Sequence, residues 1–143
     1  MAANKILVAY DESEVANRAL RMAADLALPN PEAHVDVVYV IPIPLLDESQ
    51  MQSFQDILDM MISDGEDLLG EAIETMGEGL EGRTDSLLLT GTNPANEILK
   101  LLDQRDYDLV VLGSRGLSGL KEYIGSVSHK VIHGSSIPVL VVK

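Results

Sequence analysis

The sequence predicts an α/β protein in which helices cover both faces of a parallel β-sheet. Short apolar runs rich in β-branched residues recur along the chain, and segments with helical spacing separate them. The runs are apolar throughout, which is typical of parallel strands that are buried on both faces. The chain has 143 residues, the length of one ordinary domain, and we therefore assign residues 1–143 to a single domain.

The predicted strands are the apolar runs themselves, each of strand length. They are KILVAY at 5–10, HVDVVYVIP at 34–42, DSLLLTG at 85–91, YDLVVLG at 107–113 and IPVLVVK at 137–143.

Four helices are expected between the strands. The first follows Ser13, a suitable N-cap, and stops at the prolines of residues 29–31. The second covers roughly 53–79 if Gly65 faces the core, because the other core-face positions then keep a spacing of three or four residues. These positions are Phe54, Leu58, Met61, Leu69, Ala72 and Met76.

The two later helices also have recognisable starts. The third begins with Thr92 or Asn93 as its cap and Pro94 at its first position. The fourth is short, spans 126–134 and ends in a glycine. Residues 42–52 are expected to form a loop.

Charge and composition exclude several classes of function. The net charge is −13, which disfavours a sequence-independent nucleic-acid binder because such proteins need a basic surface. No cysteine is present, so neither a disulfide nor a thiolate metal site is possible. No apolar segment resembles a signal peptide or a membrane span, and we expect a soluble cytoplasmic protein without membrane or nucleic-acid partners.

The charge is distributed unevenly along the chain. Residues 109–143 contain four Lys or Arg side chains and one Glu, a net charge of +3, which leaves −16 for the other residues. An anionic ligand is therefore attracted most strongly to the C-terminal part of the chain.

The loop after the fourth predicted strand has features of a phosphate-binding site. Glycines at 113, 116 and 119 permit close approach of a ligand to the backbone. Gly125 and Ser126 then open a helix, whose N-terminus offers unpaired N–H groups and a partial positive charge. The alternative is that these glycines only make turns. The spacing matches neither GxxxxGK[ST] nor a GxGxxG after a first strand.

Several segments together resemble the universal stress protein family over essentially the whole chain. They are KILVAYDES, VVYV, GTNPANEIL, DLVVLGSRGLSG, GSVSHKV and IPVLVVK, in this order. The resemblance implies a five-stranded parallel sheet of order 3-2-1-4-5. The nucleotide-binding branch of the family carries G-x2-G-x9-G-[ST]; here eight residues, not nine, separate Gly116 from Gly125.

The resemblance also implies roles for single residues. Asp11 and the backbone of Ala9 contact the adenosine, Val40 offers backbone groups to the base, and Gly113 approaches the ribose. The phosphates are surrounded by loop residues and by the start of the last helix, and Ser114 and Arg115 belong to the same predicted site. The phosphate set is Gly116, Gly125, Ser126 and Val127. Glu12 stands where the family often has glycine and adds negative charge nearby.

These observations predict a stress-response sensor or adaptor that binds ATP or a related adenine nucleotide, with Mg²⁺ held through the phosphates. Two alternatives remain open: a nucleotide-free dimeric interaction module, and a slow ATPase. No catalytic residue is assigned, since no arrangement of Ser, His and Asp is recognisable. A homodimer through residues 137–143 is expected, because this apolar strand lies at the sheet edge in the implied order. A downstream protein partner is expected, of unknown identity.

Other candidate sites are weaker. The acidic pair Asp11-Glu12 resembles that of response-regulator receivers, but the third predicted strand does not end in the aspartate that such proteins phosphorylate. His129 and His133 are four residues apart, yet no third metal ligand is evident, and no metal site is assigned. His34 has no partner that the sequence identifies.

Overall fold

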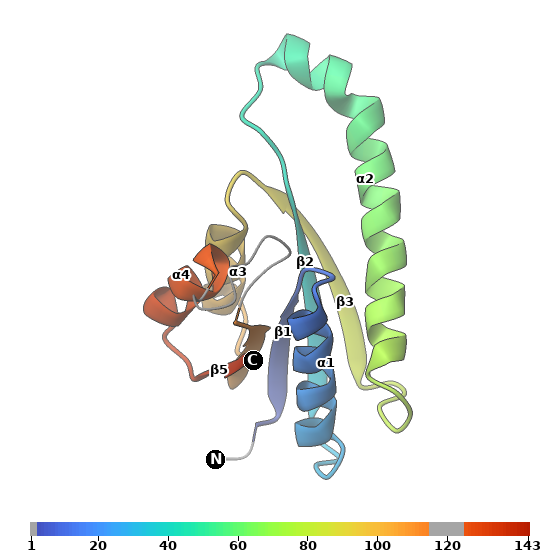
Figure 1. Cartoon of the computed structure of the whole chain (residues 1–143), viewed down its shortest axis with the longest axis vertical. Coiled ribbons are helices and arrows are strands. Elements are labelled where there is room, and N and C mark those ends of the chain that lie inside the picture. Colours follow the sequence, from blue (N-terminus) through green and yellow to red (C-terminus); the bar gives the residue numbers. More distant parts are fainter. Residues whose placement is uncertain (1–2, 115–124) are drawn as a thin grey trace.

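The computed structural model describes residues 3–114 and 125–143. Strands and helices alternate along the chain (Figure 1). The elements are β1 (Lys5–Tyr10), α1 (Glu14–Ala27), β2 (His34–Pro42), α2 (Glu48–Thr75), β3 (Thr84–Gly91), α3 (Pro94–Gln104), β4 (Leu109–Gly113), α4 (Ser126–Gly134) and β5 (Val139–Val142).

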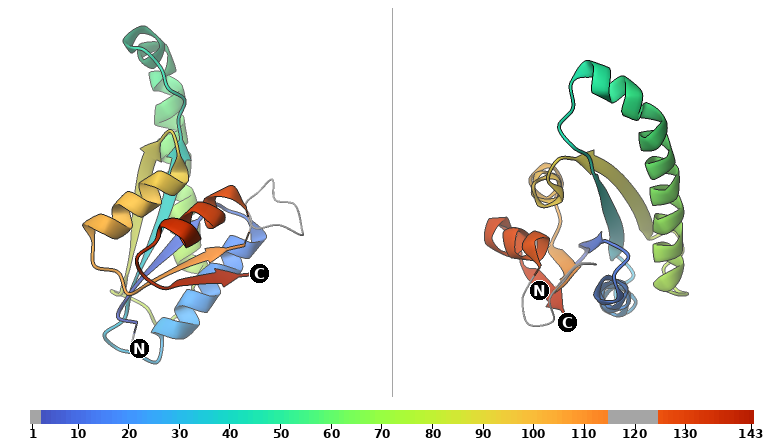
Figure 2. Two further views of the ribbon diagram at one scale, coloured as in Figure 1. Left: turned by 90° about the vertical axis from the view of Figure 1, so that its left-hand side faces the viewer. Right: turned by 45° about the horizontal axis from the view of Figure 1, so that its top comes forward.

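All five strands form one parallel sheet in the order β3-β2-β1-β4-β5. This confirms both the predicted fold class and the predicted strand order. Helices α1 and α2 cover one face and α3 and α4 the other, as the views in Figures 1 and 2 show. β1 lies in the centre, and β3 and β5 are the edges.

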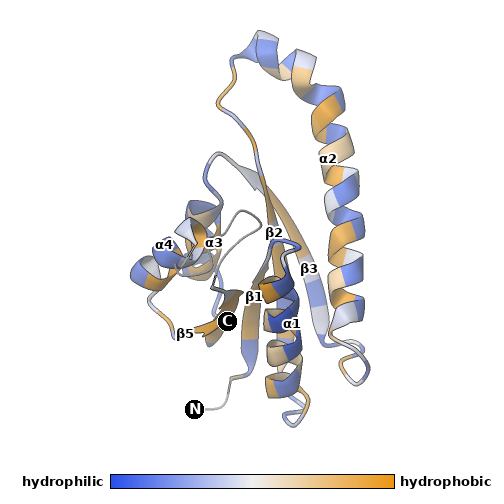
Figure 3. Ribbon diagram, viewed as in Figure 1, coloured by the Kyte–Doolittle hydropathy of each residue, from blue (hydrophilic) through white to orange (hydrophobic). Residues whose placement is uncertain are grey.

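The core consists of two apolar layers, one on each face of the sheet. In β1, Ile6 and Val8 are fully buried against α1, while Leu7 is fully buried on the α3 and α4 side. Strand residues alternate between faces, so a strand apolar at every position serves both layers. Figure 3 shows apolar colour in the central strands, interrupted by hydrophilic colour at the start of β1.

The expected N-caps of α1 and α3 are confirmed. The Ser13 side chain accepts a hydrogen bond from the Ala16 N–H and caps α1. The Asn93 side chain accepts one from the Asn96 N–H and caps α3, with Pro94 in the first turn. Each cap satisfies a backbone donor that would otherwise lack a partner.

Helix α2 begins earlier and ends earlier than predicted. The Asp47 side chain accepts from the Gln50 N–H at 2.8 Å, and the Gln50 side chain accepts from the Asp47 N–H at 3.0 Å. This reciprocal capping box starts the helix at Glu48. The prediction of a loop over 42–52 is therefore wrong for its second half. At the other end, the turn through Gly77 and Gly79, both with positive φ, terminates the helix at Thr75.

Only the second half of α2 packs on the sheet. Gly65 faces the core as predicted, and a Cβ there would lie 2.9 Å from Leu88 Cδ1. Leu69 and Ala72 are also buried. The first half extends past the end of the sheet (Figure 1), so Phe54 and Leu58 are only partly buried, although the spacing predicted a core position for both.

Strands β4 and β5 are shorter than predicted. Tyr107 lies outside β4 but is nearly fully buried, because its ring belongs to the apolar layer beneath α3. Residues 137 and 138 precede β5, and Lys143 follows it. Among the described residues, no helix is long and apolar enough to cross a membrane.

Candidate functional site

The predicted site lies where β1 and β4 end side by side. Ala9 in β1 pairs in register with Leu112 in β4. β1 ends at Tyr10 and β4 at Gly113, so Asp11 and Gly113 both lie at the carboxyl edge of two adjacent strands. In parallel sheets, ligands bind beyond this edge.

Asp11 organises the turn that leads from β1 into α1. Its Oδ1 accepts hydrogen bonds from the Ser13 N–H at 3.1 Å and from the Ser13 hydroxyl at 2.5 Å. Among the described residues, no donor contacts Oδ2. The carboxylate is thus fixed in orientation and keeps one oxygen for a ligand.

Glu12, next to Asp11, has a φ of 59°. This left-handed conformation is unfavourable for a residue with a Cβ and is readily adopted by glycine. In this chain the position instead carries a carboxylate at the edge of the sheet.

Packing against Val15 requires a glycine at position 113, independently of any ligand. A Cβ on this residue would lie 2.7 Å from Val15 Cγ2 and 3.1 Å from the Val15 backbone carbon. Its carbonyl accepts a hydrogen bond of 2.6 Å from the buried hydroxyl of Ser128. The residue therefore joins β4 to both α1 and α4, a role that its place in a glycine-rich loop did not reveal.

Two backbone hydrogen bonds tie down the ends of the predicted phosphate loop. The Ser114 N–H donates to the Val142 carbonyl at 2.8 Å, and the Ser114 carbonyl accepts from the Gly125 N–H at 2.7 Å. The loop therefore leaves β4 and enters α4 from adjacent points. Arg115 and Gly116, which belong to the predicted site, lie outside the described residues.

Among the described residues, no side chain caps the N-terminus of α4, as expected of an anion site. Gly125 is its N-cap and supplies no side-chain hydrogen bond, and no acidic residue occurs in the first turn. Ser126 is exposed and Val127 is partly exposed. Unpaired N–H groups and the helix dipole favour a negative charge at such a point.

Val40 lies two residues before the end of the second strand, whose predicted bounds of 34–42 are confirmed. β2 continues to Pro42, and Val40 pairs in register with Leu89. Its side chain is buried in the layer beneath α3 and α4. In the sheet, β1 lies between β2 and β4. Val40, in β2, therefore lies on the side of Asp11 that is away from β4.

A separate cavity of about 450 Å³ lies between α2 and the carboxyl end of β2. Apolar and acidic side chains line it, and none of the predicted site residues is among them. The lining residues are Glu12, Tyr39, Ile41, Pro42, Met61, Asp64, Gly65, Asp67, Leu68 and Glu71.

The cavity is electrostatically unsuited to phosphate, because four of its lining side chains are acidic. Burial, followed by the negative charge of Glu12, raises the pKa of both Tyr10 and Tyr39 above the ordinary value. The N-terminus of α4 therefore suits an anion better than the α2 side, where negative charge accumulates.

The structure also shows which side chains lie near the histidines. The rings of His129 and His133 lie with their centroids 4.4 Å apart, but among the described residues they belong to no group of three metal ligands. His34, which the sequence left without a partner, contacts Asp36 and Asp85 at the other edge of the sheet. The alternation of His34 and Asp36 was a signal that both side chains share one strand face.

Comparisons with known proteins agree with the fold. The universal stress protein YxiE of Bacillus subtilis is 34% identical over 98% of this chain and 99% of its own length. The structure of the universal stress protein UspA from Lactobacillus plantarum matches with a TM-score of 0.88 at 20% identity, covering 100% of this chain and 99% of that one.

A third relative is a universal stress protein from Archaeoglobus fulgidus in complex with dAMP. It matches with a TM-score of 0.62 at 25% identity, and each chain covers the other fully, at 100%. The universal stress protein family model itself matches residues 3–143. With this match and the sheet order β3-β2-β1-β4-β5, this chain belongs to the universal stress protein family.

Proposed function

We propose that this protein binds an adenine nucleotide at the carboxyl edge of β1 and β4 and acts as a nucleotide-dependent sensor or adaptor in the stress response. The observation that carries the proposal is the N-terminus of α4. It has no side-chain cap and no acid in its first turn, and it begins beside Gly113 and Ser114. The dAMP complex of the relative from Archaeoglobus fulgidus supports the ligand class.

The ligand is oriented by charge. The phosphates lie at Gly125, Ser126 and Val127, with Arg115 and Gly116 contributing from the loop. The adenosine lies toward Asp11, the backbone of Ala9 and Val40. This direction keeps the phosphates away from Glu12 and the acidic cavity.

ATP is the proposed ligand among the adenine nucleotides, with Mg²⁺ held through its phosphates. Magnesium retains several waters and is commonly bound through phosphates and one or two carboxylates. We expect the protein to act in the cytoplasm, and we assign no catalytic residue to it.

Calorimetry with ATP and MgCl₂ tests the proposal directly. Wild-type protein should bind with a stoichiometry of one per chain. Gly116→Val should abolish binding, because the added side chain blocks approach to the backbone. Gly70→Val is the matched control, since a Cβ at Gly70 meets no atom within 4 Å. Unchanged affinity in a folded Gly116→Val variant would reject the proposal.

The same protein separates the two alternatives. A nucleotide-free interaction module gives no heat with ATP, ADP or AMP and carries no excess absorbance at 260 nm after purification. This absorbance is informative because the chain has no tryptophan. A slow ATPase releases phosphate over hours, and Gly116→Val should stop that release.

A further inference from the structure

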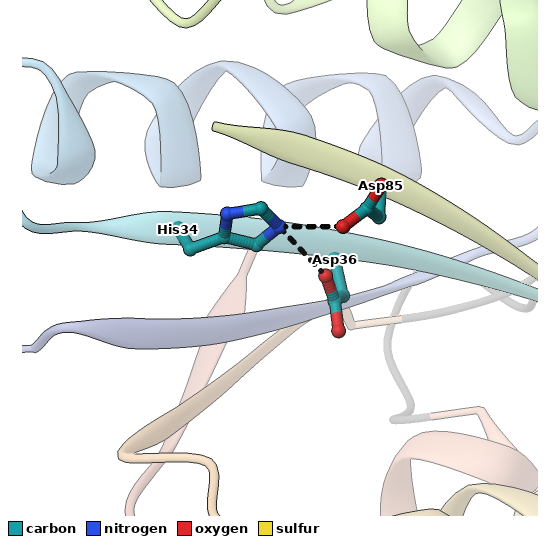
Figure 4. A group of neighbouring side chains, drawn as sticks. All are labelled: His34, Asp36 and Asp85. Atoms are coloured by element: carbon teal, nitrogen blue, oxygen red, sulfur yellow. Dashed lines mark hydrogen bonds and ion pairs between the residues drawn. The ribbon is translucent and has the colours of Figure 1, made fainter. Parts of the chain in front are cut away.

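Three potential metal ligands converge at the amino end of β2 and β3, the edge opposite the proposed nucleotide site (Figure 4). His34 Nε2 lies 2.9 Å from Asp85 Oδ2 and 3.3 Å from Asp36 Oδ1. The three ligand atoms lie within 4.8 Å of one another. In residues 3–114 and 125–143, no other group of three His, Asp or Glu side chains converges in this way.

The strand geometry places these side chains on one face. His34 and Asp36 are alternate residues of β2, so both point to the same side of the sheet. Asp85 in β3 is the register partner of Asp36. The rigid sheet, rather than a loop, thus sets the positions of all three.

Two features of the cluster favour a positive charge between the two carboxylates. Asp36 and Asp85 are like charges directly opposite each other on neighbouring strands, an arrangement that destabilises a sheet. In addition, Asp36 is only 5% exposed. A buried carboxylate is costly unless it is fully compensated.

The partners of Asp36 leave one oxygen directed at the cluster. The Tyr107 hydroxyl donates to Oδ2 at 2.6 Å, and Arg105 Nη1 lies 3.5 Å from the same atom. Among the described residues, Oδ1 has only the His34 ring nitrogen within ion-pairing distance. Metal-binding carboxylates are commonly oriented by such hydrogen bonds from behind.

We propose that His34 Nε2, Asp36 Oδ1 and Asp85 Oδ2 bind a divalent transition-metal ion, with zinc as the best fit. Metal–ligand distances of about 2.0–2.2 Å imply separations of roughly 3.0–3.5 Å between ligand atoms, for octahedral and tetrahedral geometry respectively. The two separations from His34 Nε2, 2.9 and 3.3 Å, are close to these values, and the two carboxylate oxygens lie within 4.8 Å of each other. Asp85 is 70% exposed in its side chain and His34 is 34% exposed, so water completes the coordination.

The imidazole among the three ligands disfavours magnesium, the metal proposed for the nucleotide site. Imidazole suits zinc, copper, iron and nickel, whereas magnesium prefers oxygen ligands alone. Asp36 and Val40 are four residues apart in β2, or roughly 13 Å at about 3.3 Å per residue. The metal would therefore join β2 to β3 without contacting the nucleotide.

Zinc titration of nucleotide-free, chelator-treated protein tests the site. Calorimetry should show one zinc per chain, and zinc should raise the thermal unfolding midpoint, because a ligand that binds only the folded state stabilises it. His34→Gln and Asp85→Asn should each weaken zinc binding at least tenfold and remove the rise in midpoint. Both side chains are partly exposed, so these variants should fold where a variant of buried Asp36 could fail.

Two matched variants serve as controls. Asp106→Asn removes an exposed carboxylate adjacent to Arg105 and Tyr107, and His133→Gln removes a histidine from the pair on α4. Both should bind zinc as wild type does, and magnesium should not raise the midpoint of any variant. The proposal is overturned if wild-type protein fails to bind zinc at millimolar concentration. It is equally overturned if His34→Gln and Asp85→Asn bind zinc unchanged, or if the site is lost with His133→Gln.

Discussion

The hydroxyl of Ser128 donates a hydrogen bond of 2.6 Å to the carbonyl of Gly113 and so joins the first turn of α4 to the end of β4. Ser128 is nearly fully buried, at 5% exposure. The contact therefore holds the proposed anion-binding end of α4 against the strand that precedes the phosphate loop. The glycine and serine spacing that predicted the site did not include Ser128 and so did not predict this contact.

Ser128→Ala should destabilise the protein by about 1–3 kcal/mol, because a buried carbonyl loses its donor. Ser126→Ala is the matched variant two residues away. Its side chain is exposed, so its stability should change by less than about 0.5 kcal/mol, while its affinity for ATP should fall. Urea unfolding and calorimetry on both variants separate the roles. Equal stability losses would show that Ser128 has no special part in holding α4.

Gly113→Ala should destabilise the protein by about 1–3 kcal/mol through overpacking, since the new Cβ would meet Val15. A second change, Val15→Ala, should relieve part of this loss. In a double-mutant cycle the combined variant should therefore be more stable than the sum of the single changes predicts. Gly70→Ala is the control and should be stabilising by up to about 1 kcal/mol, as expected for an open helical position. Additive effects of the two changes would contradict the proposed contact.

Glu12→Gly should raise stability by about 0.5–1 kcal/mol, because it relieves the left-handed backbone at φ 59°. It should also strengthen ATP binding by removing a carboxylate beside the site. Glu12→Ala removes the same charge but keeps a Cβ, so it should gain affinity without gaining stability. If both variants bind ATP no better than wild type, Glu12 does not repel the phosphates.

Stability should fall at alkaline pH through Tyr10 and Tyr39. Burial first, and then Glu12, raise the pKa of both phenols in the folded protein above the ordinary value of 10.0. The folded state then holds these protons more tightly than the unfolded state does. The associated stability is fully present below pH 10 and is lost as the pH rises toward the folded pKa values.

Glu12→Gln should therefore reduce this alkaline loss without abolishing it, because burial remains the larger cause. Urea unfolding measured between neutral pH and pH 11 gives the loss, and the absorbance of tyrosinate follows the combined ionisation of the four tyrosines. Glu48→Gln is the control, since this acid lies at the start of α2 and contributes to neither shift. An alkaline profile that is identical in all three proteins would contradict the role of Glu12.

The strands and the helix caps could be predicted from the sequence because their causes are local. Continuous apolar runs report double burial, and Ser13 and Asn93 act on N–H groups three residues away. The capping box of Asp47 and Gln50 is equally local. It was missed because the two prolines in the same stretch favoured the prediction of a loop.

The features that sequence analysis missed depend on contacts between distant segments. His34 and Asp85 meet although they are 51 residues apart, and only the parallel register of β2 and β3 brings them together. Gly113 owes its lack of a side chain partly to Val15, on a helix near the other end of the chain. Similarly, the extension of α2 past the sheet explains why a regular apolar spacing does not bury Phe54.

We expect the protein to form a homodimer through β5, an edge strand of the sheet. Val139 and Val141 pack on one face and Leu140 and Val142 on the other, as their alternation predicts. The alternative, in which residues 42–52 cover this edge, disagrees with the structure. The Ile43 N–H donates to the Gly91 carbonyl and so continues the pairing beside β3, at the opposite edge.

The hydrogen bonds of β5 identify the best variant for testing the dimer. The carbonyls of Pro138 and Val142 accept from β4, so the backbone groups of alternate residues, Val139 and Val141, point to the free edge. Val141→Pro should remove an outward donor while sparing the pairing with β4, and proline is tolerated on edge strands in this orientation. Light scattering coupled to size exclusion should give twice the mass of the chain for wild type and one chain mass for Val141→Pro. A wild-type monomer at tens of micromolar refutes the dimer, whereas a dimer that persists in folded Val141→Pro places the interface on another surface.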